Sequence, residues 1–259
     1  MDAGKLGEIV RTLEKAEKMR QAIPLLSSSH RFDMEEAYGI QEAWMAYKQK
    51  AGDRLIGYKM GLTSPAKMRQ MNVSEPVYGK LLASMLAENG ERLSHASFIH
   101  PRVEAEVAFL LGKDLNGEDL TEKDVLEATD HLVAAIEIID SRYENFRFTL
   151  ADVIADNASS SKFVLGHRLV STKKEDVATF GMALRINGEL KATGTPANVL
   201  GHPARSVAML AKMLARKGER LKAGDIVLAG GITEAIAVQP GDVVQASFAH
   251  LGGVEVLFV

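Results

Sequence analysis

The chain has no cysteine among its 259 residues. Disulfide bonds, thiolate metal sites and a thiol nucleophile are therefore excluded. Basic clusters interleaved with aromatic residues are also missing, and the net charge is −3. Because nucleic acids and anionic membranes bind concentrated basic surfaces, we expect neither as a partner.

Long apolar runs are missing as well, since no stretch approaches the roughly 18 consecutive apolar residues of a membrane-spanning helix. Residues 1–6 lack the apolar segment of a secretory signal. A cytoplasmic location is the resulting expectation. The apolar fraction of 46% and the charged fraction of 25% are those of an ordinary globular protein with a substantial core.

Two carboxylates stand one residue apart in an apolar segment, residues 102–111. In a strand, residues i and i+2 face the same side, so Glu104 and Glu106 project together. Two like charges in an apolar element are costly unless a cation compensates them. A divalent ion such as Mg²⁺ or Mn²⁺, which prefers oxygen ligands, would do so. The alternative is that both residues lie on the solvated face of a half-exposed strand.

A third carboxylate, Glu137, interrupts a run of Val, Ala and Ile that predicts a buried strand over residues 131–140. A lone Glu is costly to bury there. It is either a third ligand of the same ion or the ion-pair partner of an arginine such as Arg102 or Arg142. The residues alone leave both interpretations open.

Helical spacing of apolar residues predicts helix from residue 2 to about residue 51, with a break at Pro24–Ser29. Trp44 is expected to pack between the second of these helices and the core. Their apolar face, on a chain whose core is already large, leads us to expect a homo-oligomer.

The segment that follows is harder to interpret. Pro65–Met71 could begin a short helix. Residues 72–97 show few periodic signals, so we expect a mobile loop there, with Gly79 and Gly90 as hinges.

Clearer signals return in the second half. Thr121 caps a predicted helix over residues 121–130, and Asn187-Gly188 between alternating segments predicts a β-hairpin. A helix is predicted over Pro203–Arg216, and His202 before it is expected to be structural. The remaining apolar segments predict strands, so the core is expected to be mostly β with two or three helices around it.

Five segments occur in the same order as in one family, and we identify the resemblance on them: Ile56–Ser64, Pro101–Glu106, Ala135–Glu137, Ala155–Ser159 and Leu200–Pro203. They resemble the 2-hydroxypenta-2,4-dienoate hydratases and 4-oxalocrotonate decarboxylases, the meta-cleavage pathway enzymes of the fumarylacetoacetate hydrolase superfamily. The resemblance covers nearly the whole chain. It implies an α+β fold, with an N-terminal helical region and the start of an active-site loop over residues 1–72 and a mixed β-roll core over residues 73–259.

The resemblance also implies a Mg²⁺ or Mn²⁺ held by Glu104, Glu106 and Glu137, and a 2-oxo acid or its enol as the substrate. Three carboxylates leave about half of an octahedral shell for such an acid to chelate through its C1 carboxylate and C2 oxygen. Lys59 is the implied proton-transfer residue. The implied substrate contacts are Leu62, Asn157, Ser159, Ser160, Gly230, Gly231 and Thr233.

Several of these residues have plainer explanations. Lys59 lies between glycines on a short strand, where a lysine is usually solvated. The polar residues of the segment Asp156–Ser160 could merely cap a turn. Gly230 and Gly231 permit close backbone approach, and Thr233 beside them could donate a hydrogen bond to a substrate carboxylate.

Two reactions of the family fit this site. One is decarboxylation of 2-oxohex-3-enedioate (4-oxalocrotonate) to 2-hydroxypenta-2,4-dienoate, and the other is hydration of that dienoate. The segment Ala229–Glu234 resembles that of the decarboxylases. The hydratases instead have a segment similar to Thr-Gly-Ala-Leu-Gly-Pro at this place. Ser160-Ser161-Lys162 also departs from the Cys or Gly that usually follows Ser159 in the hydratases.

The resemblance therefore predicts a Mg²⁺-dependent decarboxylase of a small 2-oxo dicarboxylic acid, acting in the degradation of aromatic compounds. A hydratase is the alternative within the family. A metal-binding but catalytically silent partner subunit is the alternative outside it. The resemblance also implies a complex with the 2-hydroxypenta-2,4-dienoate hydratase of the pathway.

Overall fold

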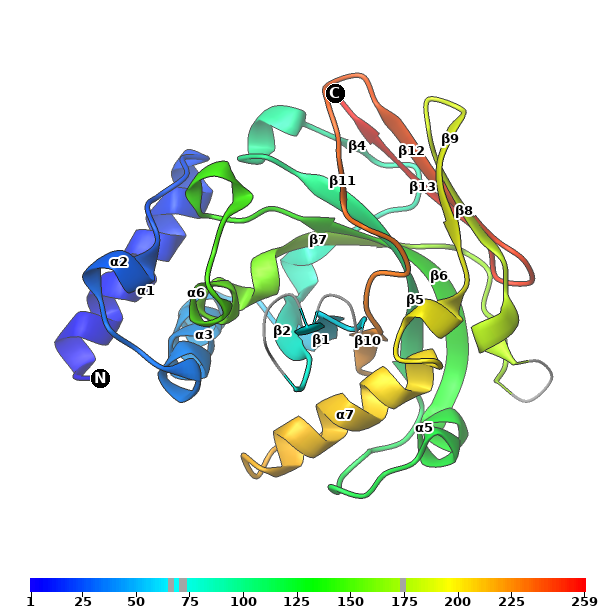
Figure 1. Ribbon diagram of the computed structural model, residues 1–259, viewed down its shortest axis with the longest axis horizontal. Coiled ribbons are helices and arrows are strands. Elements are labelled where there is room, and N and C mark those ends of the chain that lie inside the picture. The colour runs from blue at the N-terminus through cyan, green and yellow to red at the C-terminus, as the bar shows by residue number, and fades with distance from the viewer. Residues whose placement is uncertain (65–67, 70–73, 173–175) are drawn as a thin grey trace.

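The protein contains two β-sheets in a computed structural model that describes residues 1–64, 68–69, 74–172 and 176–259 (Figure 1). The strands of the larger sheet are β1 (Leu55–Gly61), β2 (Val77–Leu82), β3 (Leu86–Ala87), β5 (Arg102–Leu111), β6 (Thr129–Ile139), β7 (Ser160–Leu165), β10 (Ile226–Leu228) and β11 (Ile236–Ala237). Those of the smaller sheet are β4 (Arg92–Leu93), β8 (Met182–Ile186), β9 (Glu189–Gly194), β12 (Val243–Phe248) and β13 (Gly252–Phe258).

The larger sheet has eight strands in the order β2-β1-β10-β5-β6-β7-β3, and β11 pairs with β5. The smaller has five, in the order β4-β13-β12-β8-β9. Most neighbours are antiparallel, but β1 with β10, β3 with β7 and β4 with β13 are parallel. This mixed, curled arrangement matches the expected β-roll core.

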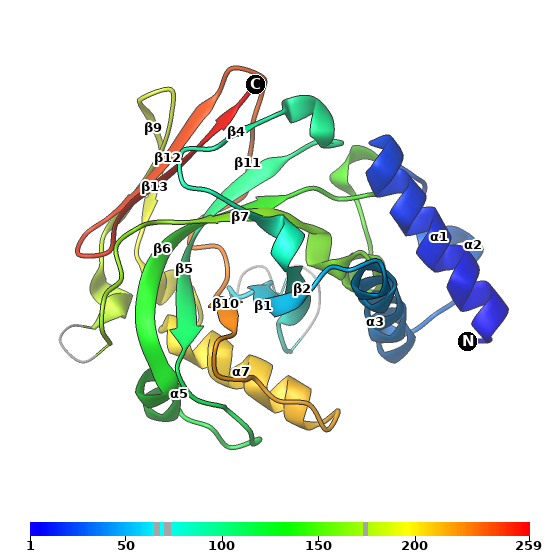
Figure 2. The ribbon, with the colours of Figure 1, turned by 180° about the vertical axis from the view of Figure 1, so that it is seen from behind.

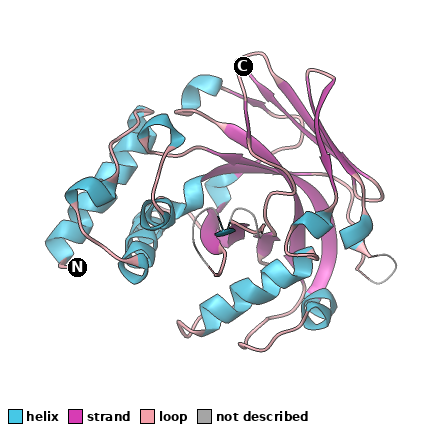
Figure 3. Ribbon diagram, in the orientation of Figure 1, coloured by secondary structure: helices cyan, strands magenta, loops and turns pink. Residues whose placement is uncertain are grey.

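The helices lie outside the sheets (Figure 3). They are α1 (Ala3–Met19), α2 (Leu26–Ser29), α3 (Met34–Lys50), α5 (Glu122–Ala128), α6 (Leu150–Ala155) and α7 (Pro203–Ala215). Short 3₁₀ turns are η1 (Ala83–Met85), η2 (His95–Ser97), η3 (Glu144–Phe146), η4 (Asn157–Ser159), η5 (Val177–Thr179) and η6 (Pro196–Asn198). Seen from both sides, α1 and α3 pack together at one end of the molecule, and the five-stranded sheet lies at the opposite end (Figures 1 and 2).

The N-terminal helices confirm the sequence prediction. Asp33 and Glu36 form a capping box that begins α3, because each side chain accepts the backbone N–H of the other residue. Trp44 is 1% exposed, and its indole N–H donates to Glu14 Oε2 at 2.8 Å, so it packs between α3 and α1 within one apolar cluster. Among the residues described, none of the helices is long and apolar enough to cross a membrane.

The signals of the second half are also confirmed. Thr121 and Asp124 form the capping box of α5. Asn187 and Gly188 join β8 to β9 with positive φ angles of 55° and 79°. His202 is the N-cap of α7, where Nδ1 accepts the backbone N–H of Ala204 at 3.0 Å, which is the structural role expected for it.

Three expectations need correction. The segment expected to be a mobile loop contains β2, all of whose residues are buried, together with η1, β3, β4 and η2. Gly79 lies inside β2, and a Cβ there would approach the Asn157 carbonyl oxygen to 2.6 Å, so it serves close packing instead of hinging. Residues 72–73 and most of the helix expected over residues 65–71 lie outside the described residues.

The apolar face of α1 is the third correction. Ile9, Val10 and Leu13 are buried against α3 and the large sheet of the same chain, so this face gives no support for an oligomer.

The strand β1 precedes residue 72 but lies inside the eight-stranded sheet. The sheet therefore takes strands from both sides of the boundary expected between the N-terminal region and the core.

Candidate metal centre

The three predicted carboxylates meet on the two central strands of the large sheet. In the antiparallel register of β5 and β6, Glu104 lies directly opposite Glu137, and Glu106 lies two residues further along on the same face. One oxygen from each carboxylate lies within 4.8 Å of those of the other two. All three residues are buried, which excludes the solvated-face interpretation.

The same sheet brings in a lysine from two strands away. In the register across β1, β10 and β5, Lys59 stands beside Leu228 and Leu228 beside Ala108, which shares a face with Glu106. Lys59 Nζ lies 2.8 Å from Glu137 Oε2 and donates to the backbone carbonyl of Ala158 at 3.3 Å. Lys59 is 3% exposed, so it is neither solvated nor loosely held.

Electrostatics in this cluster depend on burial. Burial raises the pKa of Glu106 well above its ordinary value, and the nearby charge of Glu137 adds to the effect. Burial likewise raises the pKa of Glu137, against the opposing charge of Lys59. For Lys59, burial alone would lower the pKa, but the negative charges of the three carboxylates outweigh it and the pKa is raised.

The residues fit a divalent cation. Three buried carboxylates whose oxygens lie within 4.8 Å of one another repel one another when ionised, and a divalent ion between them would offset that repulsion. Oε1 of Glu106 and Oε1 of Glu137 are buried and accept no hydrogen bond from any described residue. Buried acceptors without donors are rare, and an ion would satisfy them. Carboxylate oxygens are the ligands that Mg²⁺ and Mn²⁺ prefer.

The predicted glycine pair lies directly against two of these carboxylates. The backbone N–H of Gly230 donates to Glu106 Oε2 at 2.7 Å. A Cβ on Gly231 would lie 2.7 Å from Cδ and Oε1 of Glu104, closer than real side chains approach. A Cβ on Gly230 would lie 2.2 Å from Thr63 Oγ1. The close approach at this pair is therefore to the candidate metal-binding carboxylates and to Thr63.

The Ala155–Ser159 segment forms a left-handed turn beside Lys59. Asn157, Ala158 and Ser159 have φ angles of 51°, 52° and 58°, a conformation that costs a non-glycine residue about 1–2 kcal/mol. Asn157 is fully buried; its side chain accepts the backbone N–H of Lys80 at 2.7 Å and donates to the Lys80 carbonyl at 2.9 Å. In place of the expected substrate contact, the hydrogen bonds of this side chain are made to β2.

The other predicted contacts differ in what their side chains meet. Ser159 Oγ donates to Asp156 Oδ2 at 3.2 Å, so this serine supports the turn. Ser160 is buried, and its side-chain hydrogen bond to the Glu137 carboxylate opposes the rise that burial causes in the pKa of that group. Leu62, with φ of 58°, follows β1 directly, and Thr233 follows the glycine pair and is partly exposed. Among these predicted contacts, Ser160 is thus a polar side chain that reaches the carboxylate cluster itself.

Sequence reasoning did not predict that Arg142 supports the turn at Asn157–Ser159. Arg142, considered as a partner for Glu137, forms a buried ion pair with Asp156 instead and donates to the Ser160 carbonyl at 3.1 Å. Its guanidinium also lies 5.1 Å from the Trp44 ring centroid. Burial raises the pKa of Asp156 to about 6, although Arg142 opposes the shift. The signal that could have predicted this ion pair is Asp156, an acidic residue inside the segment Ala155–Ser159 that carries the family resemblance.

Comparison with known proteins identifies the family. Residues 43–259 match the family described as fumarylacetoacetate (FAA) hydrolase C-terminal. The chain belongs to this family. A 4-oxalocrotonate decarboxylase of Pseudomonas putida is 43% identical over 224 residues, which are 86% of this chain and 85% of that protein. A 2-keto-4-pentenoate hydratase of Dechloromonas aromatica is 41% identical over 92% of this chain and 91% of its own length.

A solved structure agrees with the family assignment over the whole chain. The 4-oxalocrotonate decarboxylase of Pseudomonas putida G7, complexed with magnesium and adipate, superposes with a TM-score of 0.97 at 38% identity and covers 100% of this chain and 99% of that one. The fold predicted from the resemblance is therefore confirmed.

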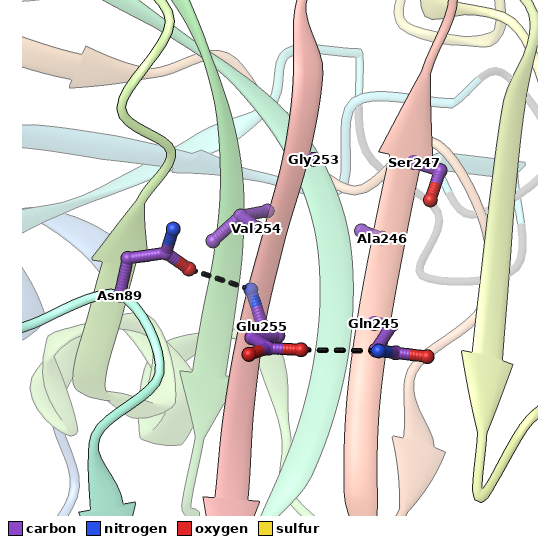
Figure 4. Close-up of a pocket in the computed structure, with 7 residues that line it drawn as sticks. All are labelled: Asn89, Gln245, Ala246, Ser247, Gly253, Val254 and Glu255. Carbon is purple, nitrogen blue, oxygen red and sulfur yellow. Dashed lines mark hydrogen bonds between the residues drawn. The ribbon is translucent and has the colours of Figure 1, made fainter.

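A separate small pocket lies on the five-stranded sheet (Figure 4). It has a volume of about 220 Å³ and is lined by Asn89, Gln245, Ala246, Ser247, Gly253, Val254 and Glu255. The Gln245 side chain donates to Glu255 Oε2 at 3.0 Å, and the backbone N–H of Glu255 donates to Asn89 at 2.8 Å. Because these groups satisfy one another and none belongs to the carboxylate cluster, the pocket has no part in the candidate site.

Proposed function

We propose that this chain is a Mg²⁺-dependent decarboxylase that converts 2-oxohex-3-enedioate to 2-hydroxypenta-2,4-dienoate and CO₂. The observation that carries the proposal is the buried group of Glu104, Glu106 and Glu137 with the Lys59 ammonium 2.8 Å from Glu137. Similarity to decarboxylases over most of the chain supports it. Adipate, the ligand of the solved neighbour, has six carbons and two carboxylates, as 2-oxohex-3-enedioate does, which favours a dicarboxylate substrate.

The three carboxylates would hold the ion, and the bound ion would stabilise negative charge at the C2 oxygen of the substrate. The electrons of the breaking C5–C6 bond form a C4=C5 double bond, those of C3=C4 move to form C2=C3, and the π electrons of the C2=O bond move onto the C2 oxygen. CO₂ leaves, and the C2 oxygen gains one proton to become the enol. The Lys59 ammonium stabilises the developing charge and donates that proton. Because the cluster is buried, water does not compete with Lys59 as the proton donor.

Hydratase relatives at similar identity make the hydratase the second candidate. Ala229–Glu234 favours the decarboxylase, because the sequence there departs from the hydratase pattern. Ultraviolet absorbance of purified protein with Mg²⁺ and each substrate separates the possibilities. A decarboxylase forms the dienol from 2-oxohex-3-enedioate, a hydratase consumes the dienol, and a silent partner subunit does neither.

Glu106→Gln tests the site assignment, because it removes a charge and keeps the shape of the side chain. Mg²⁺ affinity and turnover should fall together. Glu255→Gln, on β13 of the other sheet, is the matched control and should leave both unchanged. Full activity of Glu106→Gln after exhaustive chelation would contradict the proposal.

We also propose that the protein forms homo-oligomers in the cytoplasm and binds the hydratase of its pathway. The family resemblance supports the complex, since the hydratase consumes the dienol that the decarboxylase releases. Sedimentation at micromolar concentration, with and without the hydratase, tests it. A monomer that the hydratase does not change would contradict both the oligomer and the complex.

A further inference from the structure

The left-handed turn at Asn157, Ala158 and Ser159 is held at both ends. At one end, the Asn157 side-chain amide pairs with the backbone N–H and carbonyl of Lys80, as a residue of a strand next to β2 would. At the other, the Ser159 carbonyl accepts the backbone N–H of Asp140 at 2.8 Å. Unusual backbone conformations persist only where the surroundings impose them, and they concentrate at functional sites.

The turn places one atom against the reactive lysine. The Ala158 carbonyl accepts a hydrogen bond from Lys59 Nζ, whose ion-pair partner on the other side is Glu137. The ammonium is therefore held between a strand of the sheet and the turn. In a right-handed turn the Ala158 carbonyl would point elsewhere, and Lys59 would keep the contact with Glu137 alone.

Gly79 makes room for this arrangement. It lies next to Lys80 in β2, and a Cβ there would approach the Asn157 carbonyl oxygen to 2.6 Å and Lys59 Cδ to 3.1 Å. The glycine thus lets the turn and the lysine side chain pack against the same point of the strand. Gly79 and Lys80 of β2 therefore both support the turn that contacts Lys59.

We propose that Asn157 is a positioning residue: it holds the left-handed turn so that the Ala158 carbonyl fixes the Lys59 ammonium against Glu137. A direct substrate contact is a weaker explanation, because the side chain is fully buried and both its donor and its acceptor are bound to Lys80. The effect on turnover rests on the proposed function, whereas the effect on the ammonium itself does not.

A double-mutant cycle tests the proposal. Asn157→Ala should lower kcat roughly 10- to 100-fold, because a misplaced proton donor loses its near-attack geometry, while Mg²⁺ affinity stays within about twofold. In a Lys59→Met background, the same substitution should lower kcat no further. Reductions that multiply would show that Asn157 acts independently of Lys59 and would overturn the proposal.

The control is Asn187→Ala in the β8–β9 hairpin. Asn187 has φ of 55°, accepts the backbone N–H of Val243 at 2.9 Å and donates to Asp242 at 2.8 Å, so it loses comparable bonds far from the site. Its kcat should equal that of the wild type. Gly79→Ala, which presses on both the turn and Lys59 Cδ without removing the amide, should also reduce kcat and serves if Asn157→Ala does not fold.

A spectroscopic measurement separates this inference from the proposed function. The ¹⁵N-ammonium signal of Lys59, assigned by its loss in Lys59→Met, should be visible in the wild type and in Asn187→Ala because the buried group exchanges slowly. It should broaden or shift in Asn157→Ala and Gly79→Ala. If the wild type lacks decarboxylase activity, the proposed function fails while this arm still decides the positioning. An unchanged signal in both variants would overturn the inference.

Discussion

Replacement of Gly231 by Ala is the most direct test of how the glycine pair supports the metal centre. The new Cβ would lie 2.7 Å from Cδ and Oε1 of Glu104 and 3.0 Å from Oε2. Carbon atoms in ordinary contact lie about 3.5–4.0 Å apart, so the carboxylate must move by roughly 1 Å. Metal sites tolerate only about 0.2 Å in ligand distance. Glu104 would therefore be lost or weakened as a ligand.

We expect Mg²⁺ affinity to fall about 10- to 100-fold in Gly231→Ala, the usual effect of disturbing the support of a metal ligand. This corresponds to about 1.4–2.8 kcal/mol of binding free energy. Calorimetric titration of Mg²⁺ into metal-free protein measures it. Gly181→Ala is the matched control, because a Cβ there would meet nothing within 4 Å and its φ is not positive. An affinity of Gly231→Ala within twofold of the wild type would refute the reasoning.

Three further predictions concern the buried charges. Arg142→Met should lower the free energy of unfolding by about 3–5 kcal/mol in denaturant titrations, because it leaves the buried Asp156 carboxylate unpaired, whereas Met at the exposed Arg92 should have little effect. Burial raises the pKa of Asp156 from 3.8 to about 6, so between these values the folded state binds a proton that the unfolded state does not. Relative to Asp156→Asn, the wild type should therefore lose about 2 kcal/mol of stability as pH rises from 4 to 6, and a difference that is flat or of opposite sign would contradict the assignment. Lys59→Met should reduce kcat strongly and change Mg²⁺ affinity little, and a rise in KM with kcat intact would make Lys59 a substrate-binding group instead.

Local sequence patterns determined many of the strands, helix caps and turns of this protein. The side-chain period of a strand is set by covalent geometry, so Glu104 and Glu106 had to share a face once β5 formed. The Thr121 cap of α5 and the positive φ angles at Asn187 and Gly188 depend on near neighbours in the chain. Such features are decided within a few residues, which is why they could be predicted before any tertiary contact was known.

Only the tertiary structure decided which charges pair. Glu137 could have met Arg102 or Arg142, but β1 enters the sheet beside β10 and brings Lys59 to it, while Arg142 turns to Asp156. Strand order between distant segments leaves no periodic trace in the sequence.

The same holds for the turn and for the N-terminal helix. The Asn157 amide was available for a substrate until β2 supplied the Lys80 backbone as its partner, and β2 itself lies in a segment that showed no clear pattern. The apolar face of α1 was available for another subunit until α3 covered it. The chemistry of a side chain sets which groups it can bind. Which of those groups lies next to it in the folded protein depends on contacts between segments far apart in the chain.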